Sequence, residues 1–165
     1  MVKAHTLAGD LPMAQKELDR LDREILRLIA RDASLSLADI ADKIGLTPTP
    51  CWKRIRRMEE AGIISARVAR IDPVKVGLPV SAFVAVETAD HSAAWLQRFA
   101  DVVRETPEIV DAWRMSGDVD YLLHVVVPDI AAYDAFYRKL IAALPLRNVT
   151  SRFSMERLKD APLPI

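Results

Sequence analysis

The spacing of the apolar residues changes partway along this chain, and that change constrains its fold more than any other feature. From Leu18 to Gly62 the apolar residues recur at every third or fourth position, which is the period of one face of a helix. From Val80 onward, segments with the two-residue period of a strand alternate with helical segments. A helical first part followed by a mixed second part predicts an α+β protein.

The first part contains start and stop signals for three short helices. Asp19 can cap the first helix, and the run Ser36–Asp39 has the form of a capping box that opens the second. Gly45 ends the second helix, and the third begins at Thr47, a hydroxyl cap followed by proline at the first helical position. The tight turn between the last two helices predicts a helix-turn-helix, and residues 63–72 alternate enough to predict a small strand or wing after it.

The second part contains the signals of four strands and two helices. In chain order these are a strand at Val80–Thr88, a helix at Ser92–Glu105, strands at Ile109–Ser116 and Tyr121–Val127, a helix from Asp129 to Pro145 and a strand at about 148–158. The order βαββαβ is that of a ferredoxin-like antiparallel sheet with both helices on one face. The other face then needs a cover, and a partner chain is the economical answer.

These patterns divide the chain into four segments. They are an N-terminal extension at 1–17, a winged helix-turn-helix domain at 18–72, a linker at 73–79 and a ferredoxin-like domain at 80–165. The extension has no clear period, and prolines bound the linker.

Composition and motifs argue against several classes of protein. The single cysteine, Cys51, rules out an internal disulfide framework, and the three histidines lack the spacing of metal ligands. No glycine-rich phosphate-binding motif occurs. No apolar run reaches the roughly 18 residues of a membrane span, and the N-terminus lacks a signal-peptide pattern. We therefore expect a cytoplasmic protein with no metal, no cofactor and no membrane attachment.

The formal charge of the chain is zero, but its distribution is uneven. Residues 47–70 hold six basic and two acidic residues, a net charge of +4, whereas residues 1–46 and 71–165 have net charges of −1 and −3. The excess positive charge therefore lies on the third predicted helix and the segment after it.

The third helix has two chemically different faces. At about 100° per residue, Cys51, Ile55 and Met58 share the face that packs on the other helices, with Cys51 a small buried hydrophobe rather than a nucleophile. A helix in the major groove needs basic residues for phosphates or guanine edges and short hydroxyls for close approach. The predicted DNA-contacting residues are Thr47, Thr49, Pro50, Lys53, Arg54, Arg56 and Arg57. The alternative is a solvated charged face, and the capped helix-turn-helix around it favours DNA.

Two segments carry a resemblance to a known family. The run from Leu46 to Ile64, with its Leu-x-x-Thr-Pro-Cys start and Glu-x-x-Gly-Ile-Ile end, resembles the leucine-responsive/asparagine-responsive (Lrp/AsnC) regulators, as does the hairpin Ser116–Leu123. The resemblance covers roughly residues 18–160. It implies a transcriptional regulator tuned by amino acids, in which a ferredoxin-like effector domain dimerises through its sheets and dimers assemble into tetramers or octamers. Residues 49–54, residues 113–117 and the ending Leu163-Pro164-Ile165 look most like the branch associated with cysteine-responsive control of cysteine degradation.

The hairpin between the middle strands is a candidate effector site. A free amino acid needs acceptors for its ammonium, which Asp118 and Asp120 could supply, and donors for its carboxylate, which N–H groups around Gly117 could supply. The resemblance places the family's effector site near this hairpin and the facing strand, between dimers, which adds Met115 and Thr150. The alternative is that Gly-Asp-Val-Asp is simply good turn chemistry.

Two other functions fit the same architecture. One is an enzyme resembling the haem-pathway decarboxylases, although no His/Arg constellation can be assigned to a shared pocket. The other is a sensory module that acts only through protein contacts. We expect a DNA-binding regulator and not an enzyme, with double-stranded DNA, a small amino acid and further copies of the chain as its partners.

Overall fold

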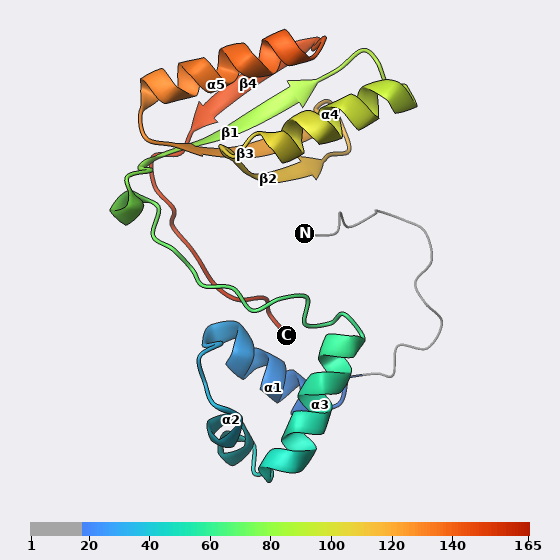
Figure 1. Cartoon of the computed structure of the whole chain (residues 1–165), viewed down its shortest axis with the longest axis vertical. Coiled ribbons are helices and arrows are strands. Elements are labelled where there is room, and N and C mark those ends of the chain that lie inside the picture. Colours follow the sequence, from blue (N-terminus) through green and yellow to red (C-terminus); the bar gives the residue numbers. More distant parts are fainter. Residues whose placement is uncertain (1–17) are drawn as a thin grey trace. The chain divides into compact units, whose positions relative to one another are not determined.

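The computed structural model describes residues 18–165, so the predicted N-terminal extension lies outside the described residues. The chain forms two compact units, drawn in Figure 1. One contains the residues up to Ala69 together with Asp160–Ile165, and the other contains Arg70–Lys159. The sequence pattern predicts residues 160–165 to be part of the second domain, whereas in the structure they group with the first unit.

The first unit is helical, as predicted. It contains α1 (Arg20–Arg31), α2 (Leu37–Lys43) and α3 (Pro48–Glu60). The side chains of Asp19 and Ser36 cap α1 and α2 in full capping boxes, whereas the Thr47 hydroxyl makes no cap hydrogen bond although Thr47 stands at the N-cap of α3. The core of this unit consists of Ile25, Leu26, Ile29, Ile40, Ala41, Cys51, Ile55 and Met58.

The chain after α3 differs from the expected small strand. Gly62 has a left-handed φ of 71°, and the N–H groups of Ile63 and Ile64 both donate to the carbonyl of Met58, at 2.9 and 3.2 Å. Residues 63–72 pair with no strand in the described chain, and a short 3-10 helix, Val74–Val76, follows. Alternating apolar residues alone do not produce a strand, because a strand without a neighbouring strand leaves its backbone N–H and C=O groups unpaired.

The end of the chain belongs to the helical unit through two contacts. The Ile165 side chain packs against the helical core, and the Arg27 Nε donates to the Ile165 backbone oxygen at 2.6 Å. The polypeptide therefore passes between the units twice, once near residue 70 and once near residue 160.

The second unit has the predicted βαββαβ order. Its elements are β1 (Val80–Glu87), α4 (Ala93–Glu105), β2 (Ile109–Arg114), β3 (Tyr121–Val127), α5 (Ile130–Ala143) and β4 (Asn148–Phe153). The sheet is antiparallel with strand order β2-β3-β1-β4. β4 ends at Phe153, which pairs with Ala82, and the N–H of Ser154 still donates to the Ser81 carbonyl at 2.8 Å. A strand reaching residue 158 would need a β1 partner before Val80, where β1 begins.

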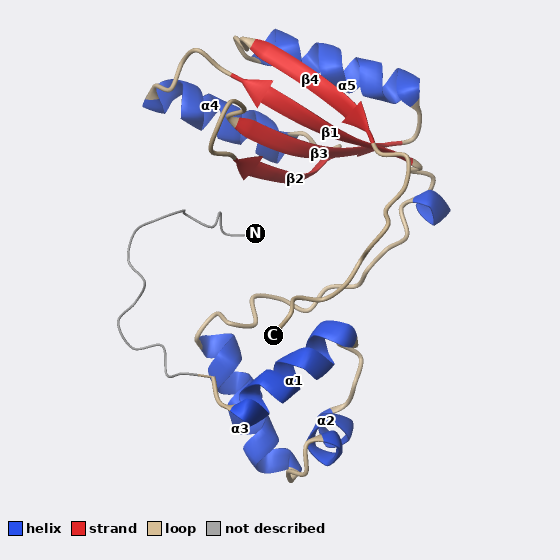
Figure 2. Ribbon diagram, turned by 180° about the vertical axis from the view of Figure 1, so that it is seen from behind, coloured by secondary structure: helices blue, strands red, loops and turns tan. Residues whose placement is uncertain are grey.

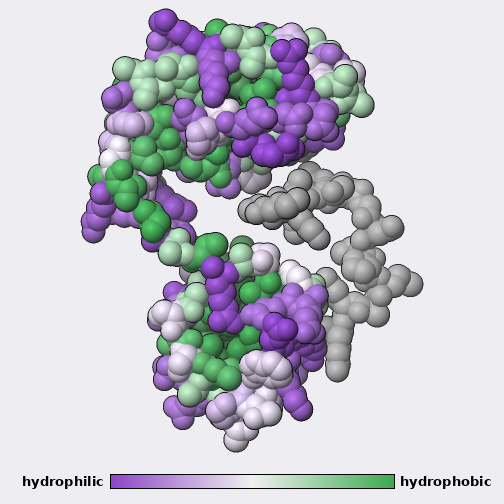
Figure 3. Space-filling model, in the orientation of Figure 1, coloured by the Kyte–Doolittle hydropathy of each residue, from purple (hydrophilic) through white to green (hydrophobic). Residues whose placement is uncertain are grey.

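The two faces of the sheet have different covers. Figure 2 shows α4 and α5 against one side, where Val84, Leu123 and Val125 are fully buried beneath the two helices. The opposite face carries Phe83, Leu122 and His124, all partly accessible. Figure 3 views this unit from the side of the two helices, where apolar side chains lie among polar ones at the surface. No helix among residues 18–165 has the length and apolar character that spanning a bilayer requires.

Candidate nucleic-acid interface and effector site

The packing face of α3 is the predicted one. Cys51, Ile55 and Met58 are buried against the other helices, and burial raises the pKa of the Cys51 thiol. Thr47, Thr49 and Pro50 are exposed at the start of the helix, and Trp52 is half-exposed beside them. The N-terminal end of α3 is therefore exposed at the surface of the helical unit.

The basic residues of α3 fall into two groups by their contacts. Arg54 donates to Asp19 at 2.6 Å and to Asp22 at 2.8 Å, and Arg57 donates to Asp22 at 2.5 Å. Lys53, by contrast, is exposed and makes no hydrogen bond or ion pair within residues 18–165. Arg56 makes only exposed contacts of 3.5 Å along its own helix, with Glu59 and Glu60.

The contacts of Arg54 shift its own pKa and that of one partner. Its hydrogen bonds with Asp19 and then Asp22 raise the pKa of the guanidinium. The pKa of Asp19 is lowered, first by the backbone N–H of Asp22 and then by the Arg54 side chain. Both groups are thus held in their charged forms, and this part of the positive charge of α3 is neutralised by α1.

Asp22 is the functional-site neighbour that sequence reasoning missed. Its side chain is 1 % exposed, yet it lies 32 and 35 positions before its two arginine partners. The signal was present as the acidic pair Asp19 and Asp22 at the start of α1, but only the capping role of Asp19 was recognised. Periodicity cannot show that the start of one helix lies beside the middle of another.

The two acidic residues of the hairpin between β2 and β3 also differ in their contacts. The Asp120 carboxylate accepts from the backbone N–H of Thr88 at 2.8 Å, and the Asp120 N–H donates to the carbonyl of Val86 at 3.1 Å. Its backbone oxygen accepts from Met115 at 2.8 Å, which closes the hairpin. Asp120 therefore ties the hairpin to the end of β1, and the exposed His91 has its Nε2 4.0 Å from Asp120 Oδ1.

Asp118 is the acidic residue of the hairpin whose carboxylate is not used in holding the described fold together. It is exposed and makes no hydrogen bond or ion pair with any other residue from 18 to 165. Gly117 beside it has φ 119°, and Met115 is exposed as well. Four of the five predicted effector residues thus share one hairpin.

Thr150 lies apart from that hairpin within one copy of the chain. It pairs with Ala85 on β1, which pairs with Leu122 on β3, which pairs with Trp113 on β2. Three strand spacings separate Thr150 from Trp113, or about 14 Å. Thr150 therefore lies on the opposite edge strand of the sheet from β2, away from the β2 end of the hairpin.

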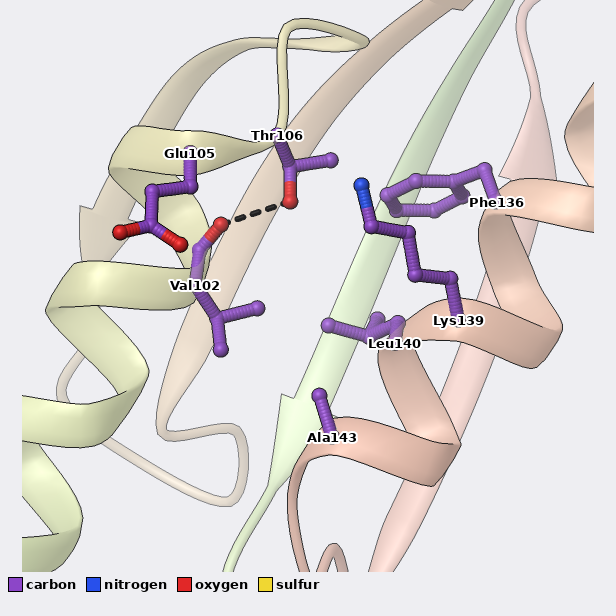
Figure 4. Close-up of a pocket in the computed structure, with 7 residues that line it drawn as sticks. All are labelled: Val102, Glu105, Thr106, Phe136, Lys139, Leu140 and Ala143. Carbon is purple, nitrogen blue, oxygen red and sulfur yellow. Dashed lines mark hydrogen bonds between the residues drawn. The ribbon is translucent and has the colours of Figure 1, made fainter.

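A hollow on the helix side of the sheet unit is a separate feature. It has a volume of about 220 Å³ and lies between α4 and α5. Figure 4 shows Lys139 extending past Phe136 and the Thr106 hydroxyl donating to the Val102 carbonyl, a bond of 2.6 Å. None of the predicted effector residues lines this hollow.

Comparisons with known proteins place both units. Residues 18–65 match the winged helix-turn-helix DNA-binding family, and residues 81–164 match the Lrp/AsnC ligand binding domain. The DNA-binding transcriptional activator DecR of Escherichia coli (strain K12) is 47% identical over 150 residues, which are 90% of this chain and 99% of that protein. The glutamate uptake regulatory protein of Zymomonas mobilis is 42% identical over 152 residues, with 90% and 93% covered.

Solved structures agree with these relatives. An AsnC family transcriptional regulator from Agrobacterium tumefaciens is 58% identical with a TM-score of 0.84, covering 88% of this chain and 96% of its own. A transcriptional regulator from Neisseria meningitidis, solved as a complex with L-Met, is 28% identical with a TM-score of 0.85, covering 90% and 97%. These relatives are regulators and not enzymes, and the chain belongs to the Lrp/AsnC family of DNA-binding transcriptional regulators.

Proposed function

We propose that this protein binds specific promoter sequences through α3 and that a small amino acid, with L-cysteine as the first candidate, tunes its DNA affinity or its assembly. The observation that carries the DNA half is the exposed start of α3 next to Lys53, which has no partner in the described chain. The effector half rests on Asp118 and on the relative solved with L-Met. The protein would act in the cytoplasm, where its DNA is.

The DNA contacts follow from the chemistry of the exposed residues. Thr47, Thr49 and Pro50 are small enough to let the end of α3 approach base edges in the major groove. Lys53 and Arg56 present their charges beyond them, where phosphates or guanine edges would lie. Arg54 and Arg57 lie closer to α1, because Asp19 and Asp22 hold them there.

The effector contacts follow from the needs of a zwitterion. The Asp118 carboxylate would accept from the ligand ammonium, and N–H groups around Gly117 would donate to its carboxylate. Thr150 would come from another copy of the chain, since it lies across the sheet from the hairpin. L-cysteine is favoured by the sequence resemblance of residues 49–54 and 113–117 to the cysteine-responsive branch.

Assembly would couple the two functions. The uncovered sheet face, with Phe83 and Leu122, would pack against a second copy, and dimers would join into tetramers or octamers with the effector between them. A ligand that binds between copies shifts assembly only by its difference in affinity for the two states. A typical coupling of about 1–3 kcal/mol would change operator affinity some 5–150-fold.

The DNA half can be tested by a gel-shift titration with genomic promoter fragments. The double variant Lys53→Ala/Arg56→Ala should lose operator affinity while keeping its oligomeric state in sedimentation. Unchanged affinity would refute the contact assignment. A shallow salt dependence in the wild type would instead favour a module that acts without touching DNA.

The effector half can be tested by calorimetry with each of the amino acids. L-cysteine, or another small amino acid, should bind and change DNA affinity, and Asp118→Ala should blunt the response. Asp134→Ala is a matched control, because Asp134 is an exposed carboxylate on α5. No binding by any amino acid would reject the proposal.

A further inference from the structure

The carboxylate of Asp22 is buried and uses both of its oxygens. Oδ1 accepts from Arg54 at 2.8 Å, and Oδ2 accepts from Arg57 at 2.5 Å and from the backbone N–H of Asp19 at 3.2 Å. Its side chain is 1 % exposed, whereas those of Arg54 and Arg57 are 25% and 41% exposed. The acid is therefore fixed inside the unit, and the arginines reach inward from the surface to meet it.

The capping box of α1 prevents this acid from turning away. Asp19 Oδ1 accepts from the Asp22 N–H at 2.9 Å, and Asp19 Oδ2 accepts from Arg54 at 2.6 Å. Rotating either acid toward solvent would break the cap as well as an ion pair. The same two acids thus cap one helix and bind two arginines of another.

Moving Arg54 or Arg57 away from Asp22 to a DNA phosphate is unfavourable. A phosphate that drew Arg57 or Arg54 away would leave a buried carboxylate with less compensation, and an uncompensated buried charge is strongly destabilising. Arg56 has no such constraint, because its exposed pairs with Glu59 and Glu60 are of the weak kind. Lys53 has no partner among residues 18–165 to give up.

We propose that Asp22 is a specificity-determining residue, which withholds Arg54 and Arg57 from the DNA backbone and leaves Lys53 and Arg56 as the phosphate contacts of α3. This inference rests on the proposed DNA binding. Phosphate contacts supply affinity for any sequence, so reducing their number lowers non-specific binding and leaves more of the discrimination to base contacts. Each contact contributes about −0.9 to the slope of log K against log salt, so α3 contributes about −1.8 per protomer instead of about −3.6.

The test uses the full chain and two duplexes of equal length. One is selected from random sequence by the wild-type protein, and the other has the same bases in scrambled order. Affinity for both is measured over a series of salt concentrations with wild type and with Asp22→Asn, which keeps the shape of the side chain and removes its charge. Circular dichroism and thermal melting establish that the variant is folded at the assay temperature.

Asp22→Asn should bind scrambled DNA more tightly at low salt, with a slope steeper by up to about 1.8 per protomer, and its specificity ratio should fall. A purely structural role would weaken binding to both duplexes without steepening the slope, and that result would overturn the inference. Wild-type protein that binds neither duplex would refute the proposed DNA binding itself.

A second variant keeps the inference falsifiable if Asp22→Asn does not fold. Lys53→Ala/Arg56→Ala should lose about 1.8 per protomer from the slope, leaving little of the contribution of α3. The matched control Lys139→Ala removes an exposed lysine on α5 and should keep the wild-type slope. Arg57→Gln, which can still donate to Asp22, should also keep the wild-type slope. A loss of about 0.9 per protomer in that variant would show that Arg57 contacts phosphate, which contradicts the inference.

Discussion

Helix α3 and the β2–β3 hairpin, which belong to different units, divide their charged residues in the same way. In α3, Arg54 and Arg57 are bound by acids of α1 while Lys53 has no partner in the described residues. In the hairpin, Asp120 is bound to the end of β1 while Asp118 has none there. Charged residues of the same sign that are close in sequence thus fall into two groups: some bind a neighbouring element, and others have no partner among residues 18–165. Sequence spacing alone does not separate the two kinds.

The largest effect is expected where a bound charge loses its partner. Asp22→Ala removes both arginine contacts and one half of the α1 capping box, so the free energy of unfolding of the helical unit should fall by about 3 kcal/mol. Chemical denaturation monitored by circular dichroism measures it. The matched control is Asp42→Ala, an exposed acid on α2, which should stay within about 0.5 kcal/mol of wild type. An equal loss of unfolding free energy in the two variants would contradict the distinction between charged residues that bind a neighbouring element and those that do not.

The hairpin offers the same contrast at a smaller scale. Asp120→Ala leaves the N–H of Thr88, a residue that is 4 % exposed, without its acceptor, which should cost about 2 kcal/mol of stability. Asp118→Ala should cost less than about 0.5 kcal/mol but should impair the amino-acid response. Paired denaturation and calorimetry on the two variants separate these outcomes. If Asp118→Ala were the more destabilising variant, its proposed ligand role would lose its basis.

The elements that sequence patterns predicted well are those whose signals are local. The caps at Asp19 and Ser36, the packing face containing Cys51, and the βαββαβ order all depend on residues a few positions apart. These features follow from helical and strand periods, which act within one element.

The features that sequence patterns missed depend on distant partners. The strand expected at residues 63–72 has no neighbouring strand to complete its hydrogen bonds. The net charge of +4 on residues 47–70 does not include Asp19 and Asp22, which lie 32 to 35 positions before the arginines of α3 that they bind. Ile165 packs on the helical core although it follows the last strand. A single sequence carries no record of which distant residues meet.

The turn itself can be probed through its backbone. Gly117 has φ 119°, a conformation that a side chain disfavours, although a Cβ there would meet nothing within 4 Å. Gly117→Ala should therefore cost about 1 kcal/mol through backbone strain alone. Thermal melting gives the stability, and calorimetry reports whether the N–H groups near Asp118 still bind the ligand. A stabilising effect would mean that the turn relaxes and that its geometry is not fixed by Asp120.

The smallest effect on stability is expected at His124, a partly buried side chain that has a hydrogen-bond partner but can still gain a proton. It lies on the uncovered sheet face, stacked on Phe83 and hydrogen-bonded with the Ser81 hydroxyl at 2.8 Å. Burial lowers its pKa, with Arg157 acting in the same direction and Asp111 opposing them.

The unfolded chain therefore binds more protons than the folded one between the ordinary histidine value of about 6.5 and the lowered value. Stability should be complete above about pH 6.5 and should decline as the pH falls through that window. His124→Gln should flatten this decline in melting curves measured at a series of pH values, and His91→Gln, at an exposed position of the same unit, is the control. A decline unchanged by His124→Gln would show that the open face of the sheet tolerates a charged imidazole, and that its burial there is too slight to bias protonation.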